Sequence, residues 1–274
     1  MHLAFVFTNY NNSKITLEAI DSILSSKGNF EVSIVIVDNA SKPEEKSILK
    51  GTSFSGTEVN FLFSDENIGY FKGLNKGLKF LYNNKIQADY ITVGNNDLVF
   101  SRSFFQTIFE SQDKINKYPV ISPNIITLDG VHQNPHVIDK VSTIRELVYD
   151  IYYSNYFMAK IINKAAKYTK SLTDRDDESY HDVPQLINQG YGACYVLTKK
   201  FIDEFEFLWS PTFMMSEEYF LSLQLEKEGY KVFYEPSIVV KHHCHATMGQ
   251  LKSRFMWSLA RDAHKEYRKY RKIF

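Results

Sequence analysis

The sequence predicts an α/β fold in which helices cover both faces of a central, mostly parallel sheet. Two observations support this prediction. Short apolar runs rich in β-branched residues alternate with segments of helical periodicity, and these runs are continuously apolar rather than alternating. Strands of that kind are buried on both faces, which is typical of parallel sheets. In addition, polar residues cluster directly after several of the runs.

The elements of the first part of the chain follow in order. Each expected strand is a short apolar run, and the strands lie at residues 3–7, 32–37, 59–63 and 90–93. Each expected helix has apolar residues at helical spacing, and the helices lie at residues 15–24, 72–82 and 104–117.

After Pro119 the pattern becomes less regular. Further strands are expected at residues 120–126, 193–197, 232–234 and 238–240, and further helices at residues 141–168, 217–228 and 253–274. Tyrosines at helical spacing between residues 149 and 156 indicate packing within the fold or against a second subunit, which leaves a homodimer open. The charged run at residues 174–178 is interpreted as a solvated loop.

The composition narrows the classes of function. A chain of 274 residues, 44% hydrophobic and 23% charged, is long enough for one large or two small soluble domains. The formal net charge is zero, so we expect no nucleic-acid partner. Two cysteines, Cys194 and Cys244, cannot form a disulfide framework and fit a reducing compartment. We expect neither a signal peptide nor a transmembrane helix, and hence a cytoplasmic enzyme or binding protein.

Three polar clusters follow strands of the predicted sheet, and we call them the polar edge. They are Thr8-Asn9-Tyr10, Asp38-Asn39 and Asn95-Asn96-Asp97. The carboxyl ends of parallel strands share one edge, so these clusters are expected to converge on a nucleotide-sized site. Carboxylate and amide oxygens suit a hard cation such as Mg²⁺ or Mn²⁺, which in turn suits a diphosphate. The alternative is that Asn and Asp serve ordinary turns here.

An ordered set of short motifs carries a resemblance to a known family. The first motifs are Phe7-Thr8-Asn9-Tyr10-Asn11, Val37-Asp38-Asn39-Ala40-Ser41 and Asn67-Ile68-Gly69-Tyr70-Phe71-Lys72-Gly73-Leu74-Asn75. They are followed by Asn95-Asn96-Asp97, Pro123-Asn124-Ile125, Gly192-Ala193-Cys194, Ser216-Glu217-Glu218 and Pro236 with His242. In order and spacing this set resembles family 2 glycosyltransferases of the GT-A fold, over residues 3 to about 245. The resemblance is strongest to the rhamnosyltransferase-like branch, which builds bacterial surface polysaccharides.

The resemblance implies a set of residues that bind a sugar-nucleotide donor. Its members are Thr8, Asn9, Asp38, Asn67, Gly69, Asn75, Asn95 and Asn96. Thr8 and Asp38 would contact the nucleobase and ribose, with Asp38 accepting from the base. Gly69 would let the backbone approach the ligand closely. The alternative for residues 67–75 is a turn rich in Asn and Gly for conformational reasons alone.

The resemblance also implies a metal site. Asp97 would bind the cation, Mn²⁺ or Mg²⁺, and His242 would be a metal or diphosphate ligand. Asn95 stands where the family often has an acidic residue, which leaves one less charge. The run 242–245 (His-His-Cys-His) is not expected to hold zinc, because adjacent residues of a strand point to opposite faces. His243 and His245 are then structural or solvent-facing.

On the acceptor side the resemblance implies a general base. Counting back from Gly229 aligns Glu218 with the family's catalytic Asp, and Glu217 with the acidic residue before it. Phe220 departs from the family, because a second Asp is usual at that position. The alternative is that two Glu at the start of a helix merely favour its dipole.

Together these implications describe an inverting, metal-dependent glycosyltransferase. It would move a sugar from a nucleoside-diphosphate sugar to a hydroxyl of a glycan or lipid-linked saccharide, at the inner face of a bacterial membrane. One alternative is a nucleotidyltransferase, which predicts a Gly-rich and Lys-bearing phosphate loop where this chain has Thr8-Asn9-Tyr10-Asn11-Asn12. The other is a catalytically inactive carbohydrate- or nucleotide-binding subunit, which the departures at Asn95, Glu218 and Phe220 keep open.

The chain is expected to divide into a GT-A domain, residues 1–250, and a basic amphipathic C-terminal helix, residues 251–274. From Lys252 onward there are eight Lys or Arg and two acidic residues, and aromatic and aliphatic residues share one helical face. Two alternatives follow. Either the helix holds the protein peripherally on anionic membrane, or its apolar face packs on the catalytic domain or a partner subunit.

Overall fold

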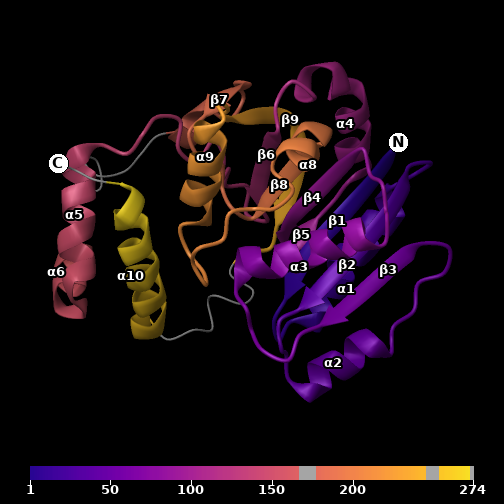
Figure 1. Cartoon of the computed structure of the whole chain (residues 1–274), viewed down its shortest axis with the longest axis horizontal. Coiled ribbons are helices and arrows are strands. Elements are labelled where there is room, and N and C mark those ends of the chain that lie inside the picture. Colours follow the sequence, from indigo (N-terminus) through magenta and orange to yellow (C-terminus); the bar gives the residue numbers. More distant parts are fainter. Residues whose placement is uncertain (167–176, 245–252, 272–274) are drawn as a thin grey trace.

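The computed structural model describes residues 1–166, 177–244 and 253–271. Over these residues the chain forms a nine-stranded mixed sheet with helices on both faces (Figure 1). The strand order is β3-β2-β1-β4-β8-β6-β9-β5, and β7 pairs with β9. The predicted fold class is confirmed. No helix in the described part of the chain is long and apolar enough to cross a membrane.

The N-terminal half contains the parallel part of the sheet. Its strands are β1 (His2–Asn9), β2 (Glu31–Asp38), β3 (Glu58–Phe63) and β4 (Tyr90–Asn95). Its helices are α1 (Ser13–Ser26), α2 (Pro43–Lys50), α3 (Tyr70–Asn83) and α4 (Arg102–Ile115). The expected strands and helices of this half are present, and α2 is additional. Helix α2 is short and largely polar, so periodicity misses it, although Pro43 followed by Glu44 and Glu45 is a helix-start signal.

The rest of the sheet has mixed pairing. Its strands are β5 (Leu98–Val99), β6 (Val120–Thr127), β7 (Gln185–Ile187), β8 (Cys194–Thr198) and β9 (Val232–His242). Strand β8 is antiparallel to β4 and β6, and β6 is parallel to β9. The expectation of two separate strands around Pro236 is wrong, because both belong to β9. Pro236 falls where the register with β6 shifts, so it interrupts no regular ladder.

The two faces of the sheet bury different sets of side chains. Phe5 and Phe7 of β1 lie in a cluster with residues of α1 and α4, including Phe104. Val6, between them, faces the other side and packs with residues of α3. A Cβ at Gly77 of α3 would lie 2.3 Å from Val6 Cγ1, so this glycine lets α3 approach the sheet closely. Each fully buried aliphatic or aromatic side chain stabilises the fold by about 1.5–3 kcal/mol.

The remaining helices lie in the second half of the chain. They are α5 (Thr143–Ser154), α6 (Tyr156–Ala166), the 3-10 helix η1 (Asp177–Tyr180), α8 (Lys199–Glu204), α9 (Glu217–Lys227) and α10 (Ser253–Tyr270). The helix expected at residues 141–168 is two helices, because Asn155 between them has extended φ and ψ of −160° and 160°. Residues 167 and 168 lie outside the described residues. Figure 1 shows α5, α6 and α10 together at one end of the molecule, and we call them the helical unit.

Tyr153 and Tyr156 of the tyrosine stripe pack within the helical unit, as one of the two predictions stated, whereas Tyr149 is exposed. The ring of Tyr153 lies 4.6 Å from that of His264, and the ring of Tyr156 lies 5.5 Å from that of Trp257. Of the two alternatives for the C-terminal helix, the structure shows packing on the same chain, because Trp257 and Ala263 are buried. Of the charged run, residues 174–176 lie outside the described residues, and its last two residues begin η1 rather than a loop.

Candidate active site

The polar edge converges as the topology predicts. Parallel pairing sets Asn9 opposite Asp38 and Thr8 opposite Asn95, so the three strand ends meet at one edge. Asn9 Nδ2 donates to Asp38 Oδ2 over 2.8 Å, and Asn96 Nδ2 donates to Asn9 Oδ1 over 3.2 Å. Asn9, Asp38 and Asn96 are all buried. Residues that lie far apart in the sequence therefore form one buried hydrogen-bonded network.

Within this network Asp38 already accepts hydrogen bonds on both carboxylate oxygens. Oδ2 accepts from Asn9, and Oδ1 accepts from the backbone N–H of Ser41 over 3.0 Å. The neighbouring Asn39, which belongs to the polar edge but not to the predicted donor set, differs. Its Nδ2 donates to the Gly69 carbonyl over 2.9 Å, which fixes the amide orientation. Its buried Oδ1 has no hydrogen-bond partner among the residues that the structure describes, so it can accept from a bound water or ligand.

The described contacts of Asn67, Gly69 and Asn75 are made within the protein, to residues of segment 67–75 and of the loop before α9. Gly69 has φ of 90°, and a Cβ there would lie 2.0 Å from the carbonyl oxygen of Phe213. Glycine is therefore required here for the close approach to Phe213, and the approach of Gly69 to a ligand stays a prediction. Asn67 Oδ1 accepts from Gly69 N–H over 3.0 Å. Asn75 exchanges two hydrogen bonds with the backbone of Leu208, at 2.7 and 2.9 Å, and so ties α3 to the loop before α9.

Asp97 and His242 lie side by side, as the metal prediction requires. Antiparallel pairing of β5 with β9 sets Leu98 opposite His242. His242 Nε2 lies 3.0 Å from Asp97 Oδ1, and both residues are buried. The Nδ1 atom of His242 lies 2.7 Å from Gln133 Oε1, an acceptor, so Nδ1 carries the proton. The Nε2 atom faces the carboxylate of Asp97, which is also an acceptor, so a cation bound between the two would take the place of a proton there.

Asn95 lies close to this pair, and no further metal ligand does among the described residues. Asn95 Nδ2 lies 3.5 Å from His242 Nε2. The described residues contain no group of three or more His, Cys, Asp or Glu side chains placed to hold a metal ion, so Asp97 and His242 would act as a pair. Among these residues there is likewise no zinc-type cluster, and His245 lies outside them.

Glu218 and Glu217 differ sharply in environment. Glu218 Oε1 accepts from the backbone N–H of Gly192 over 3.1 Å, and a Cβ at Gly192 would lie 2.6 Å from that oxygen. Glu217 is buried, and its Oε1 has no hydrogen-bond partner in the described part of the chain. Burial, followed by the charge of Glu218, raises the pKa of Glu217 from 4.5 to about 8. Glu217 is therefore the protonated member of the pair at neutral pH.

Tyr191 lies between the Asp97–His242 pair and Glu218, which are the two acidic regions of the site. No pattern in the sequence selects it. The backbone N–H of the next residue, Gly192, donates to Glu218 Oε1. The ring centroid of Tyr191 lies 6.1 Å from that of His242. Gln133, whose Oε1 lies 2.7 Å from His242 Nδ1, also lies near the Tyr191 side chain. Burial, with the nearby charges of Glu218 and Asp97, raises the pKa of Tyr191 to about 12. The phenol therefore stays protonated and can donate to a ligand oxygen.

A parallel half ending in a polar edge, joined to a mixed half with a carboxylate pair, defines the GT-A class of α/β folds. The chain belongs to glycosyl transferase family 2, whose model matches residues 5–175. No curated protein sequence gives a significant match.

Three solved structures share the fold. GalNAc-T7 with UDP, GalNAc and Mn²⁺ has a TM-score of 0.57 at 10% identity, over 88% of this chain and 44% of that chain. The mannosyltransferase PcManGT from Pyrobaculum calidifontis, with GDP-Man and Mn²⁺, has a TM-score of 0.55 at 12% identity, over 89% and 57%. S. aureus TarS 1–349 has a TM-score of 0.52 at 11% identity, over 88% and 60%. The chain spans about half the length of these structures, and the likeness shows the fold alone.

Proposed function

We propose that the chain is an inverting, metal-dependent glycosyltransferase that moves a sugar from a nucleoside-diphosphate sugar to an acceptor hydroxyl. The observation that carries this proposal is the segment Tyr191-Gly192, which joins the Asp97–His242 pair to Glu218. Glycosyl transfer needs charge stabilisation at the leaving diphosphate and a base at the acceptor. Both kinds of group flank this one segment, and membership of glycosyl transferase family 2 supports the same reaction.

The nucleotide would bind across the polar edge. Thr8 would contact the nucleobase or ribose, and the unpaired Oδ1 of Asn39 would accept from a base N–H. Asp38 is proposed to accept from the base as well, and its bonds to Asn9 and Ser41 hold it in place for that contact. The other members of the donor set would support these residues: Asn67, Gly69, Asn75, Asn95 and Asn96.

A divalent cation, Mn²⁺ or Mg²⁺, would be held by Asp97 and His242. The orientation of His242 by Gln133 fits this role, because histidine ligands of metals usually donate their second ring N–H to an oxygen acceptor. The structures of GalNAc-T7 and PcManGT contain Mn²⁺. When bound, such a cation offsets the charge that develops on the departing nucleoside diphosphate.

Glu218 would act as the general base toward the acceptor hydroxyl. Glu217 is buried, and its pKa of about 8 leaves it protonated at neutral pH, so it cannot accept the acceptor's proton. The Gly192 N–H holds one oxygen of Glu218 in place. The deprotonated acceptor would attack the anomeric carbon from the face opposite the diphosphate, which inverts its configuration.

For the biological setting, we propose a growing glycan or lipid-linked saccharide as acceptor, in the synthesis of a bacterial surface polysaccharide at the cytoplasmic side of the membrane. The resemblance of the motifs to the rhamnosyltransferase-like branch supports this setting and a rhamnosyl donor. Residues 1–250 would form the catalytic domain, and residues 251–274 a C-terminal helix that packs between α5 and α9 of that domain.

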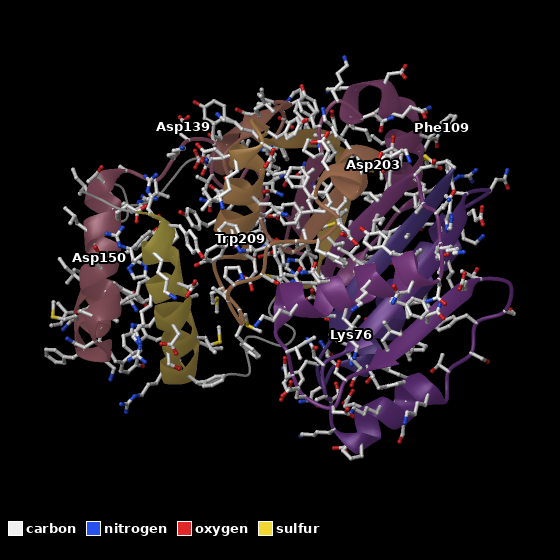
Figure 2. All side chains as sticks on the ribbon, in the orientation of Figure 1. Lys76, Phe109, Asp139, Asp150, Asp203 and Trp209 are labelled. Atoms are coloured by element: carbon white, nitrogen blue, oxygen red, sulfur yellow. The ribbon has the colours of Figure 1, made fainter. Side chains whose placement is uncertain are left out.

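One observation favours the inactive-subunit alternative. Phe220, at a position where the family usually has Asp, is fully buried, with its ring 5.4 Å from that of Trp209 (labelled in Figure 2). The position therefore serves the core in this chain and provides no polar group for an acceptor. Metal-dependent hydrolysis of a sugar nucleotide separates the two functions, because an inactive binding subunit would bind the donor and leave it intact.

The donor is best identified by a thermal-shift screen of UDP, GDP, dTDP and their sugar derivatives, with and without Mn²⁺. A ligand at 100 times its dissociation constant stabilises the folded state by about 2.7 kcal/mol. Asp97→Ala is the matched control, and its melting temperature should not respond to Mn²⁺ and donor together. If no nucleotide stabilises the native protein in the presence of Mn²⁺, the proposed function is wrong.

A further inference from the structure

A stripe of large apolar side chains is exposed on the outside of the helical unit. On α5 it consists of Ile144, Leu147, Val148 and Ile151, which recur at the spacing of one helix face. On α6, which packs against α5, Phe157 and Ile161 are exposed as well. Ile144 is 76% exposed and Phe157 is 70% exposed. We call these six residues the outer face. Exposed apolar patches of this kind mark surfaces that meet another apolar body.

The charges around the outer face are arranged asymmetrically. Helices α5 and α6 contain two acidic residues, Glu146 and Asp150, and both point inward to α10. Asp150 lies 2.8 Å from His264 Nε2 and 3.1 Å from Arg268 Nε, and Glu146 lies 3.3 Å from Arg271 Nε. On α6, Lys160 and Lys164 are exposed. The outer face therefore combines apolar side chains and lysines without an exposed acidic group of α5 or α6.

Helix α10 packs against both α5 and α9. Trp257 Nε1 donates to the Tyr152 carbonyl over 3.3 Å, and the ring of Tyr267 lies 4.2 Å from that of Tyr219 on α9. Figure 1 shows α10 between the α5–α6 pair and α9. Trp257 and Tyr267 of α10 are thus used in contacts within the protein, whereas Phe255 is 50% exposed. Because Tyr219 follows Glu218, the same contact places the helical unit on the acceptor side.

We propose that the outer face docks on a membrane surface rich in anionic lipid. Apolar side chains would enter the headgroup boundary, and Lys160 and Lys164 would attract the anionic headgroups. Charge favours this occupant over a second copy of the chain, since a symmetric pairing through the outer face would bring the lysines of both copies together. The proposal concerns binding of the protein without donor or metal, so it stands independently of the catalytic assignment.

The test is co-sedimentation of the full chain with vesicles of pure phosphatidylcholine and of equal parts phosphatidylcholine and phosphatidylglycerol. The native protein should pellet with the anionic vesicles and be released by salt. The double variant Ile144→Asp with Phe157→Asp should bind at least about tenfold more weakly, since burial of one large apolar side chain is worth about that factor. Both substitutions lie in the first turn of a helix, where an acidic residue favours the helix, so the fold is retained.

Two further variants make the test specific. Phe109→Asp is the matched control, because Phe109 is a 49%-exposed residue of α4. Figure 2 shows Phe109 at the opposite end of the molecule from Asp150 of α5. This variant should bind vesicles as the native protein does. Lys160→Gln with Lys164→Gln should keep the apolar contribution and weaken the salt-sensitive part of the binding.

Three results would overturn the proposal. The first is that the native protein does not pellet with anionic vesicles, and the second is that the outer-face variant pellets equally well. The third is that light scattering shows a native dimer that the outer-face variant loses, with vesicle binding unchanged. That outcome would make the outer face an interface between copies of the chain. None of these results depends on donor binding, so they are distinguishable from a failure of the proposed activity.

Discussion

The polar edge and the helical unit depart from the usual distribution of side chains in opposite directions. At the polar edge, Asn9, Asp38 and Asn96 are buried. On the helical unit, Ile144 and Phe157 are large, apolar and exposed. Burying polar groups and exposing apolar ones both cost stability. Neither region is therefore explained by folding alone, and each indicates a surface that meets a ligand or another body.

The two regions are joined through the first turn of α9. Glu218 faces Gly192 in the candidate active site, and the next residue, Tyr219, packs on Tyr267 of the helical unit. The candidate active site and the helical unit are thus in contact with neighbouring residues of α9. The comparison predicts that substitutions at the polar edge, Asp97 and Glu218 change donor binding or sugar transfer. Substitutions on the outer face should change membrane binding only.

The largest effect is expected at Glu218. Glu218→Gln should retain donor and metal binding and lose transfer by about 10²–10⁴-fold in kcat, because an amide cannot accept the acceptor's proton. Transfer rates at saturating donor, with donor affinity measured by calorimetry, are the required data. Glu217→Gln is the matched control and should affect transfer less, since Glu217 is already protonated at neutral pH. If Glu217→Gln is the inactive variant instead, the assignment of the base is off by one residue.

Asp97→Ala should have the next largest effect, on donor affinity. The substitution removes the only carboxylate of the Asp97–His242 pair, so Mn²⁺-dependent donor binding should be lost. Titration calorimetry with the nucleoside diphosphate, with and without Mn²⁺, measures this. His242→Ala should have a milder effect, because His242 supplies one neutral ligand. An Asp97→Ala protein with unchanged Mn²⁺-dependent affinity would remove Asp97 from the metal role.

Much of this arrangement was accessible from the sequence, for a physical reason. Continuously apolar strands predict a buried parallel sheet, and parallel strands place their carboxyl ends at one edge. The convergence of Asn9, Asp38 and Asn96 follows from those two facts alone. The adjacency of Asp97 and His242, 145 residues apart, came from the resemblance, since no local pattern connects them.

The remaining features depend on contacts that a pattern does not encode. Gln133 and Tyr191 have ordinary sequence surroundings, and only the fold brings them to His242. The unpaired oxygen of Asn39 appears only once its Nδ2 is seen to bind Gly69. The amphipathic pattern of α10 fits both protein and lipid, and only the structure shows that Trp257 packs against α5. The outer face of α5 is recognisable only after its covered side is known.

The buried Glu217 predicts a pH dependence of stability with a defined sign. Its pKa is 4.5 when unfolded and about 8 in the fold, so between these values the folded state binds more protons than the unfolded state. The free energy of unfolding therefore falls as pH rises from about 4.5 to about 8, by a few kcal/mol for this group. Glu217→Gln should flatten that fall in denaturant titrations at several pH values. An equally steep fall in the variant would mean that another group causes it.

The smallest effect is expected at Tyr191, and it tests whether the two acidic regions work as one site. Tyr191→Phe keeps the ring beside His242 and removes the hydroxyl. The loss of one hydrogen bond to a reacting group should lower kcat by about tenfold or less, with little change in donor affinity. Tyr82→Phe is the matched control, because its hydroxyl also has a pKa raised to about 12 but binds the Glu206 carbonyl in a different part of the fold. A merely structural role for Tyr191 would lower the melting temperature and leave kcat unchanged. A lower kcat at unchanged KM would show that the hydroxyl acts in the reaction.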